Sequence, residues 1–121
     1  MSSGKVAPEE IIDNFRELAV KHSEAAEKSD YRKANKIFDE LESLFKRFQG
    51  DETLEEIVIT TLLKDDDIRI RVQASMKALR LKKHIQESMN IIEEAQHQTV
   101  FRILRVDSHM ALKVWQERGT F

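Results

Sequence analysis

The stretch LLKDDDIRIRVQASMKAL, residues 62–79, decides the fold class of this chain. Its two leucines end one apolar segment, its three aspartates form a polar break, and apolar residues then recur at helical spacing to about Leu81. Asp66 or Asp67 is placed to cap the second segment, because a carboxylate accepts hydrogen bonds from the free N–H groups of a helix start. The stretch therefore predicts two helices joined by a short turn, the second packed between neighbours because it is apolar on two faces.

Two further helices are predicted upstream. Pro8, whose missing N–H costs nothing at a first helical position, and the apolar period after it indicate a helix over about residues 8–28. Ser29 or Asp30 caps the next helix, which carries a wide apolar stripe and ends before Gly50. A stripe this wide favours packing inside a bundle over a coiled-coil seam.

The helix that leads into the central stretch has its own start signal. Thr53 and Glu56 have the spacing of a capping box, in which each side chain satisfies the other residue's free backbone N–H. This helix runs to about Lys64. At the far end of the central stretch no Gly or Pro marks the next corner, which we place at Lys82 and Lys83.

The last quarter of the chain predicts two more helices. Apolar residues recur at helical spacing over residues 85–95, whereas residues 100–106 fit either a helix or an extended linker. Asp107 or Ser108 then caps a final helix that ends before Gly119. Its inward residues are expected to be Ala111, Leu112 and Trp115, with Trp115 as a core anchor.

Together these segments predict an all-α fold of about six helices, each of about 12 to 20 residues, stacked in antiparallel pairs. The 121 residues suffice for one domain, expected over residues 8–121 behind a flexible tail of residues 1–7. Three Gly and one Pro are too few for the turns of an all-β fold. The absence of Cys excludes a disulfide scaffold, a thiolate zinc site and a Cys nucleophile.

Sequence motifs for catalysis and cofactor binding are missing. No two of the four histidines have the helical spacing of a metal site, and no HExxH, Walker or dinucleotide-binding glycine motif occurs. We therefore expect no enzyme activity, no metal and no cofactor. His22 continues the apolar stripe of the first helix and is expected at the core or its boundary. With no signal-peptide core and no apolar run long enough for a bilayer, the expected location is the cytoplasm.

Residues 62–79 resemble a HEAT-type repeat: a helix ending in Leu-Leu, an Asp-containing turn, an aliphatic–Arg step, small residues and a Leu. The turn holds Asp and Ile where such repeats usually carry Pro. With residues 107–119, DSHMALKVWQERG, the chain resembles a family of small bacterial HEAT-like proteins of unknown function. The resemblance implies a short right-handed stack of helical pairs, since one repeat cannot bury both of its faces alone.

Acidic and basic residues are unevenly distributed. The net charge is −2, yet residues 39–67 carry ten acids and three bases, and residues 68–121 carry five acids and ten bases. Helix capping and solvation are the simplest explanation of the run Asp65–Asp67, followed by docking of a basic partner, with a cation site least favoured. An acidic surface would steer a basic partner to the protein.

The favoured function is a non-catalytic protein-binding module. Small helical-repeat proteins of this kind resemble the immunity proteins found beside bacterial toxins, including those of contact-dependent growth inhibition. The expected partner is then a basic toxin domain, for example a nuclease, because nuclease toxins must bind nucleic acid. The candidate partner-binding residues are Asp51, Glu52, Glu55, Glu56, Asp65, Asp66 and Asp67.

Two alternatives remain at this stage, together with an open oligomeric state. A general interaction scaffold without a toxin partner is one of them. The other is a HEAT-like nucleic-acid-binding protein, in the manner of alkylpurine DNA glycosylases, although the pI of about 6.1 and the shortage of aromatic residues expected at the surface argue against it. Its candidate phosphate contacts are Arg69, Arg71, Lys77, Arg80, Lys82, Lys83, Arg102 and Arg105.

Overall fold

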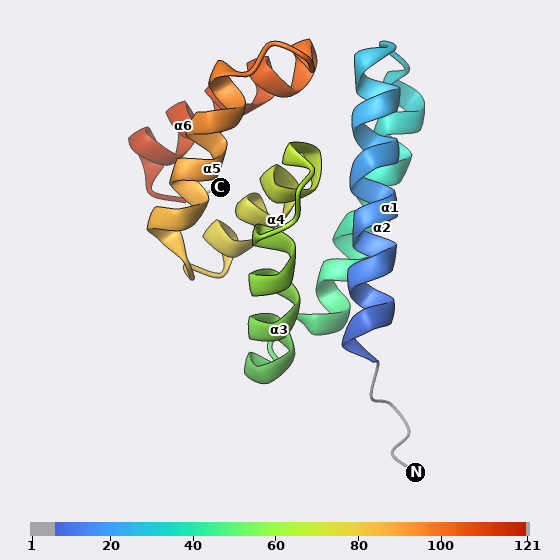
Figure 1. The fold of residues 1–121 in the computed structure, drawn as a ribbon, viewed down its shortest axis with the longest axis vertical. Helices are drawn as coiled ribbons and strands as arrows, with labels where there is room; N and C mark the ends of the chain where they lie inside the picture. The colour runs from blue at the N-terminus through green and yellow to red at the C-terminus, as the bar shows by residue number, and fades with distance from the viewer. Residues whose placement is uncertain (1–6, 121) are drawn as a thin grey trace.

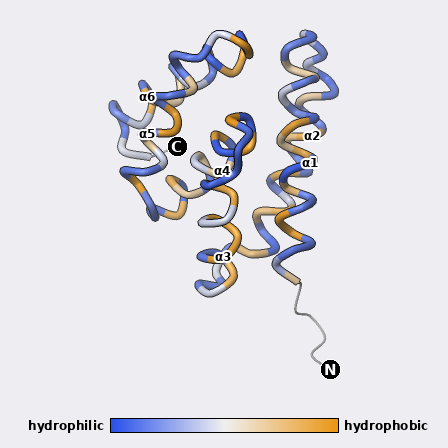
Figure 2. The backbone as a smooth tube through the Cα atoms, viewed as in Figure 1, coloured by the Kyte–Doolittle hydropathy of each residue, from blue (hydrophilic) through white to orange (hydrophobic). Residues whose placement is uncertain are grey.

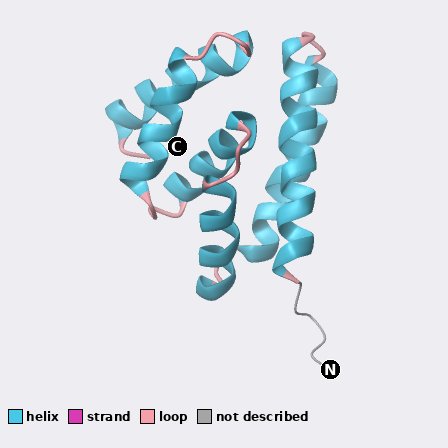
Figure 3. Cartoon of the chain, viewed as in Figure 1, coloured by secondary structure: helices cyan, strands magenta, loops and turns pink. Residues whose placement is uncertain are grey.

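The computed structural model describes residues 7–120, and within that range it contains six helices and no strand (Figure 3). In chain order the helices are α1 (Pro8–Glu27), α2 (Tyr31–Phe48), α3 (Glu52–Leu63), α4 (Ile68–Arg80), α5 (Ile85–His97) and α6 (Arg102–Arg118). The predicted all-α fold is therefore confirmed. Of the expected tail over residues 1–7, all but Ala7 lies outside the described residues, and the Ala7 carbonyl already accepts a hydrogen bond from Glu10 N–H at 3.1 Å.

Helix α1 is the element against which most of the others pack. It contacts α2, α3, α4 and α6, while α3 contacts α4, α4 contacts α5 and α5 contacts α6. In Figure 1, α1 and α2 stand on one side, α5 and α6 on the other, and α3 and α4 lie between them. These contacts are consistent with the expected stack of helical pairs.

The main core lies where α1 to α4 meet. Its largest fully buried side chains include Phe15 of α1 and Phe45 and Phe48 of α2, whose two rings pack edge to face with centroids 5.3 Å apart. Val58 and Leu62 of α3 belong to the same core cluster. In Figure 2, hydrophobic and hydrophilic residues alternate along each of these helices, as expected for helices with one apolar side. Burial of such large apolar side chains is the main stabilising contribution to the fold.

Trp115 of α6, expected as a core anchor, is only partly buried. It packs at the edge of a smaller cluster formed by Leu79, Ile92 and Leu112, and the Lys82 ammonium lies 5.5 Å from its ring centroid. Leu112 is buried as expected. The tryptophan therefore covers this second cluster from the solvent side instead of filling its interior.

Two helix ends share one hydrogen-bond pattern without using glycine. After α1, Asp30 N–H donates to the Ala25 carbonyl at 2.9 Å, and after α4, Lys83 N–H donates to the Ala78 carbonyl at 3.0 Å. Both are Schellman-type closures, which place Ser29 and Lys82 in the left-handed region with φ of 61° and 58°. The predicted corner at Lys82 and Lys83 is confirmed, as is the cap of α2 by Asp30, which accepts from Lys33 N–H at 3.2 Å.

The capping box predicted for α3 is wrong. The N-cap lies two residues earlier in the chain than predicted, and the glutamate that reaches back lies one residue earlier. Asp51 is the N-cap and accepts a hydrogen bond from Leu54 N–H at 3.1 Å, so Thr53 lies inside the helix. The glutamate that reaches back is Glu55, whose carboxylate accepts from Gly50 N–H at 2.6 Å. The observed pair of Asp51 and Glu55 is separated by four residues, not by the three of a capping box, and the backbone at Asp51 has the extended conformation of an N-cap.

The start of α6 also differs from the prediction. The helix begins at Arg102, so Asp107 and Ser108 lie inside it and residues 102–106 are helical. Phe101 is the N-cap residue but has no side-chain cap; instead the Glu27 carboxylate of α1 accepts hydrogen bonds from Ile103 N–H and Leu104 N–H, each at 3.0 Å. A cap supplied from a distant helix leaves no local sequence signal, which explains the error.

Over the described residues, none of the helices combines the length and the apolar character that crossing a membrane would require.

Candidate functional site

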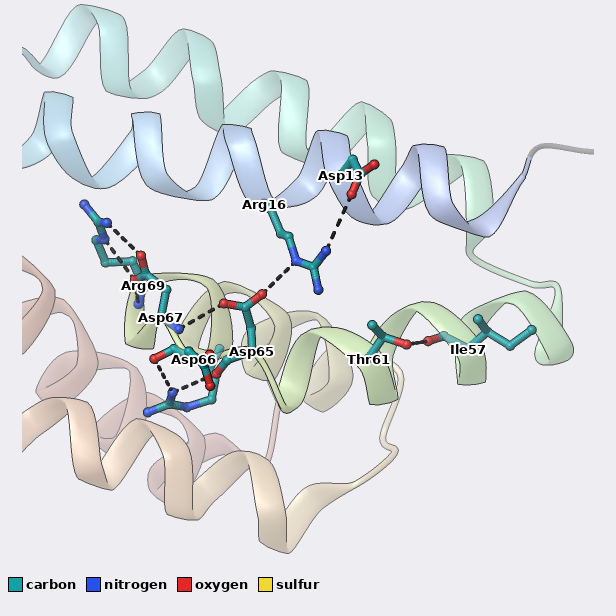
Figure 4. Close-up of polar contacts among 9 residues, drawn as sticks. Asp13, Arg16, Ile57, Thr61, Asp65, Asp66, Asp67 and Arg69 are labelled. Carbon is teal, nitrogen blue, oxygen red and sulfur yellow. Dashed lines mark hydrogen bonds and ion pairs between the residues drawn. The ribbon is translucent and has the colours of Figure 1, made fainter.

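The turn between α3 and α4 holds Asp65 in a network that reaches α1 (Figure 4). Arg16 Nε donates to one Asp65 carboxylate oxygen at 2.7 Å, and the other oxygen accepts from Asp67 N–H at 2.9 Å. The Asp65 side chain is 13% exposed. Asp65 thus shapes the turn and joins it to α1, which limits what it offers to a partner.

Of the two aspartates predicted as possible caps of α4, Asp66 and Asp67, the structure assigns the role to Asp67. Its carboxylate accepts from Arg69 N–H at 2.9 Å and from the Arg69 guanidinium at 3.0 and 2.7 Å. The hydrogen bonds from the Arg69 side chain outweigh the opposing effect of burial and lower the pKa of Asp67. Asp67 is therefore ionised at neutral pH and committed to the helix start.

Asp66 differs from both of its neighbours. Its side chain is exposed and makes no hydrogen bond or ion pair with the part of the chain that the structure describes. Only its backbone carbonyl is engaged, as an acceptor from Arg71 at 3.1 Å. Of the run of three aspartates, Asp66 alone presents a free carboxylate.

At the amino-terminal end of α3, too, one acid is used by the fold and another is exposed. Glu55 is buried and accepts from Lys83 Nζ at 2.7 Å as well as from Gly50 N–H. Burial of Glu55 opposes ionisation, but the hydrogen bonds from Lys83 and Gly50 outweigh it and lower the pKa of the carboxyl. Glu55 is a structural residue, whereas Glu52 is exposed and forms no hydrogen bond or ion pair within residues 7–120, although its charge attracts Lys83 at longer range.

The remaining two acids of the predicted site are exposed but engaged. Asp51 caps α3, and Glu56 lies 3.0 Å from His84 Nε2. The candidates also separate in space, because Asp51–Glu56 and Asp65–Asp67 belong to opposite ends of α3, a helix about 18 Å long. The structure therefore leaves Glu52 and Asp66 as the exposed, unpaired members, one at each end of α3.

Most of the basic residues considered for phosphate binding are paired within the fold. Arg69 pairs with Asp67, Arg71 with Glu94, and Lys83 with Glu55. Lys82 reaches the Gly119 carbonyl at 3.3 Å. These contacts divide the basic residues among separate ion pairs instead of aligning them as one free face.

Lys77 is the most buried charged residue in the described part of the chain. Its side chain is 3% exposed, its ammonium contacts the Glu42 carboxylate, and it lies 5.1 Å from the Phe38 ring centroid. Burial lowers the pKa of Lys77, and the hydrogen bond that the ammonium donates to Glu42 opposes that effect. Arg80 pairs with the same carboxylate at 2.7 Å, so Glu42 of α2 forms ion pairs with two cations of α4 and links the two helices.

A groove between α1, α4 and α6 is the other candidate site, and sequence analysis did not predict it. Its volume is about 450 Å³, within the usual range of ligand-binding pockets. The walls are mainly apolar and include Phe38, Met76, Ile103, Met110 and Val114. In Figure 1, α1 and α6 approach each other at the top of the view and diverge below, with α4 between them.

Several polar side chains also line the groove. His22 of α1 and Asp107 of α6 both reach it, as do Ser23 and Gln73. Burial lowers the pKa of His22, with a smaller opposing effect from Asp107, so the imidazole is neutral at neutral pH. Burial also raises the pKa of Asp107. His22, predicted for the core or its boundary, is half-buried and lies at the boundary.

One sequence signal pointed toward the groove. Asp107 recurs with Ile103, Met110 and Val114 at helical spacing, which puts a carboxylate in the middle of an apolar stripe. The assignment of Asp107 as a helix cap concealed this, because a capping residue would not belong to the stripe.

Within residues 7–120 no three His, Asp or Glu side chains come together as a metal site would require. Comparison with known proteins found no protein-family model, no curated protein and no solved structure that matches this chain.

Proposed function

We propose that this protein is a non-catalytic protein-binding module. The observation that carries the proposal is the groove between α1, α4 and α6, a concave and mainly apolar surface that the fold itself leaves unfilled. Surfaces of this kind bind partners through apolar contacts, with a few polar groups fixing orientation. As part of the same proposal, the helices form a short HEAT-like stack in antiparallel pairs that acts in the cytoplasm.

The partner proposed is a toxin whose activity this protein neutralises. Glu52 and Asp66 support a basic partner, because both carboxylates are exposed and unpaired at the two ends of α3. Exposed acids accelerate association with a basic protein and lose this effect as salt rises. In this proposal, the acids at the two ends of α3 attract the basic partner, and the wider surface that includes the groove makes the direct contacts with it.

The test is a charge reversal that spares the fold. The double variant Glu52→Lys/Asp66→Lys changes only unpaired acids, and Asp39→Lys/Glu40→Lys on α2 applies the same charge change to another exposed surface. Each tagged protein is expressed in cells that encode the chain, and retained proteins, including the product of the neighbouring gene, are identified. We expect wild type and the α2 variant to retain one basic protein that the α3 variant loses.

The recovered protein is then produced alone in a heterologous host. The proposal predicts that it arrests growth and that the wild-type chain restores growth, whereas the α3 variant restores it poorly. A retained protein without toxicity would support the scaffold alternative instead. Equal retention and protection by all three forms would show that the α3 ends are merely solvated surface.

Binding of nucleic acid is the weaker candidate. A phosphate-binding face needs several cations free to pair with phosphates, yet Arg69, Arg71 and Lys83 already pair with carboxylates of the fold. Lys77 is buried against Glu42. The ion pairs therefore favour a protein partner.

A further inference from the structure

The three helices around the groove each contribute a stripe at helical spacing. On α6 the lining residues extend from Ile103 to Val114, on α1 from Ala19 to Glu27, and on α4 from Arg69 to Met76. The α6 stripe is about 16 Å long, or three helical turns. Lining residues that recur over two to three turns of each helix suit a helix laid into the groove better than a compact small ligand.

Three hydrogen-bonding side chains in the groove have no partner within the described residues. Ser23, at 6% exposure, has a buried hydroxyl with no hydrogen bond. Gln73, at 8% exposure, has an amide for which the fold supplies no hydrogen bond. The Asp107 carboxylate is exposed at the rim of the groove and forms no hydrogen bond or ion pair with the described residues. Water can solvate the exposed Asp107 carboxylate and reach the Gln73 amide, whereas the buried Ser23 hydroxyl is costly to leave unpaired unless a ligand satisfies it.

The other charged groups that line the groove are already neutralised. Glu27 accepts two N–H groups from the start of α6, and Arg69 pairs with Asp67 while stacking 4.7 Å from the Phe101 ring centroid. His22 lies near Asp107 but is uncharged at neutral pH. Asp107 is thus the one lining residue, among those described, whose charge is left for a partner to neutralise.

We propose that the groove between α1, α4 and α6 binds an amphipathic helix of the partner protein, with one Lys or Arg of its apolar face paired with Asp107. The inference rests on the proposed protein-binding function and names the part of the partner that enters the groove. Apolar residues at i, i+3 and i+7 of that helix pack against Phe38, Met76 and Met110. Methionines suit such a surface, since their flexible side chains adapt to the helix they meet.

The test uses a designed helix, because the partner's sequence is unknown. The probe is a blocked, side-chain-stapled peptide of about 15 residues with leucines at i, i+3 and i+7 and one lysine on the same face. The matched probe carries norleucine, which keeps the alkyl chain and removes the charge, in place of the lysine. Dissociation constants are measured for both peptides against wild type, Asp107→Asn and the control Asp39→Asn, whose carboxylate is exposed on α2.

A double-mutant cycle isolates the charge pair. We expect Asp107→Asn to weaken binding of the lysine peptide about tenfold, the loss of one charge-assisted hydrogen bond, and to leave binding of the norleucine peptide unchanged. Asp39→Asn should change neither. If wild type binds neither peptide, or if Asp107→Asn weakens both equally, the proposed pair is overturned.

A second pair of variants tests the groove itself. Met110 and Val106 lie on the same helix with similar exposure, 52% and 49%, but only Met110 lines the groove. Met110→Glu should abolish binding of both peptides, whereas Val106→Glu should leave it intact, with far-UV circular dichroism showing both variants folded. Equal effects of the two substitutions would place the peptide elsewhere and overturn the proposal.

Two further measurements separate the remaining outcomes. Hexylamine presents the same charge on a short alkyl chain, and Asp107-dependent binding as tight as that of the peptide would make the occupant a small amine and overturn the helix. The α3 variant Glu52→Lys/Asp66→Lys should still bind the lysine peptide. Loss of partner capture by that variant with intact peptide binding supports both proposals. Peptide binding without any captured partner would overturn the proposed function and leave the groove inference standing.

Discussion

Carboxylates in the acidic turn between α3 and α4 are hydrogen-bonded within the fold, whereas the carboxylate in the groove beside α6 is not. In the turn, Asp65 and Asp67 each receive hydrogen bonds from arginines and from backbone N–H groups, and both serve the fold. In the groove, Asp107 lies among apolar side chains and receives none from the described chain. The more conspicuous acidic run is thus largely structural, while the isolated acid is left for a ligand.

The cause of this difference is the number of donors within reach. A helix start offers several free N–H groups, so acids that follow a turn are satisfied locally. The middle of a helix offers none, because its N–H groups are bonded within the helix. An acid at such a position, including the exposed Asp107, is satisfied by water, by a neighbouring element or by a partner.

The largest effect is expected where a paired acid is removed from a buried cation. Glu42→Gln should lower the free energy of unfolding by about 3 kcal/mol, because Lys77 would remain buried without its counter-charge. Chemical denaturation measures the change. The double variant Glu42→Gln/Lys77→Met should recover most of the loss, since it removes both charges. A double variant as unstable as the single one would mean that the loss comes from packing.

The next effect concerns Glu55, the buried acid at the start of α3. Glu55→Gln should cost about 1 to 2 kcal/mol at pH 7, the loss of charge-assisted hydrogen bonding to Gly50 N–H. The exposed Glu52→Gln on the same helix is the control and should be near neutral. A cost shared by both variants would indicate a general effect of charge at the helix start.

Acid titration checks the same residue independently. The folded protein holds the Glu55 pKa below its ordinary value of 4.5, so the stabilisation is present above that value. It is lost as the pH falls through the lowered pKa. The stability difference between wild type and Glu55→Gln should therefore shrink below about pH 4.5. A difference that stays constant into acid would show that the carboxylate charge is not responsible.

A helix boundary could be predicted from the sequence only where the residues that fix it lie within a few positions of it. The start of α1 at Pro8 was predicted, and the caps of α2 and α4 were each predicted to within one residue, because proline and capping side chains act over a few residues. The start of α6 was missed because its N–H groups are capped by Glu27. Tertiary capping carries no periodic signal, so it appears only once the helices are packed.

The candidate site was less predictable than the fold for the same reason. The charge run that suggested a docking surface contains Asp65, whose partner Arg16 lies on α1 and was not predicted from the sequence. A carboxylate's availability depends on its neighbours in space. The groove depends on three helices that are separated along the chain, and no motif records their approach.

Asp107 should respond in the opposite direction to the paired acids. Burial raises its pKa above the ordinary value of 3.8, so the ionised form is disfavoured in the folded protein. This cost is fully present above the raised pKa and disappears below the unfolded value. Asp107→Asn should therefore raise the free energy of unfolding at pH 7, by less than about 1 kcal/mol because the carboxylate is partly solvated. The gain should appear as a higher midpoint temperature of thermal unfolding.

The same comparison near pH 3 serves as the control for that variant, because wild type is then protonated and the difference should vanish. Destabilisation by Asp107→Asn at pH 7 would mean that the carboxylate already has a favourable partner in the protein alone. The groove would then lack the unpaired charge on which the binding inference depends.

The smallest effect is expected at Asp66, between the two structural aspartates. Asp66→Asn should change the free energy of unfolding by less than about 0.5 kcal/mol, since the side chain is exposed and has no contact with the described residues. Asp65→Asn should destabilise measurably, because it weakens the charge-assisted bond from Arg16 that joins the turn to α1. Equilibrium denaturation of the two variants gives the contrast within one turn. Equal losses would show that the run acts as one electrostatic unit, and Asp66 would no longer be a free carboxylate available for attracting a basic partner.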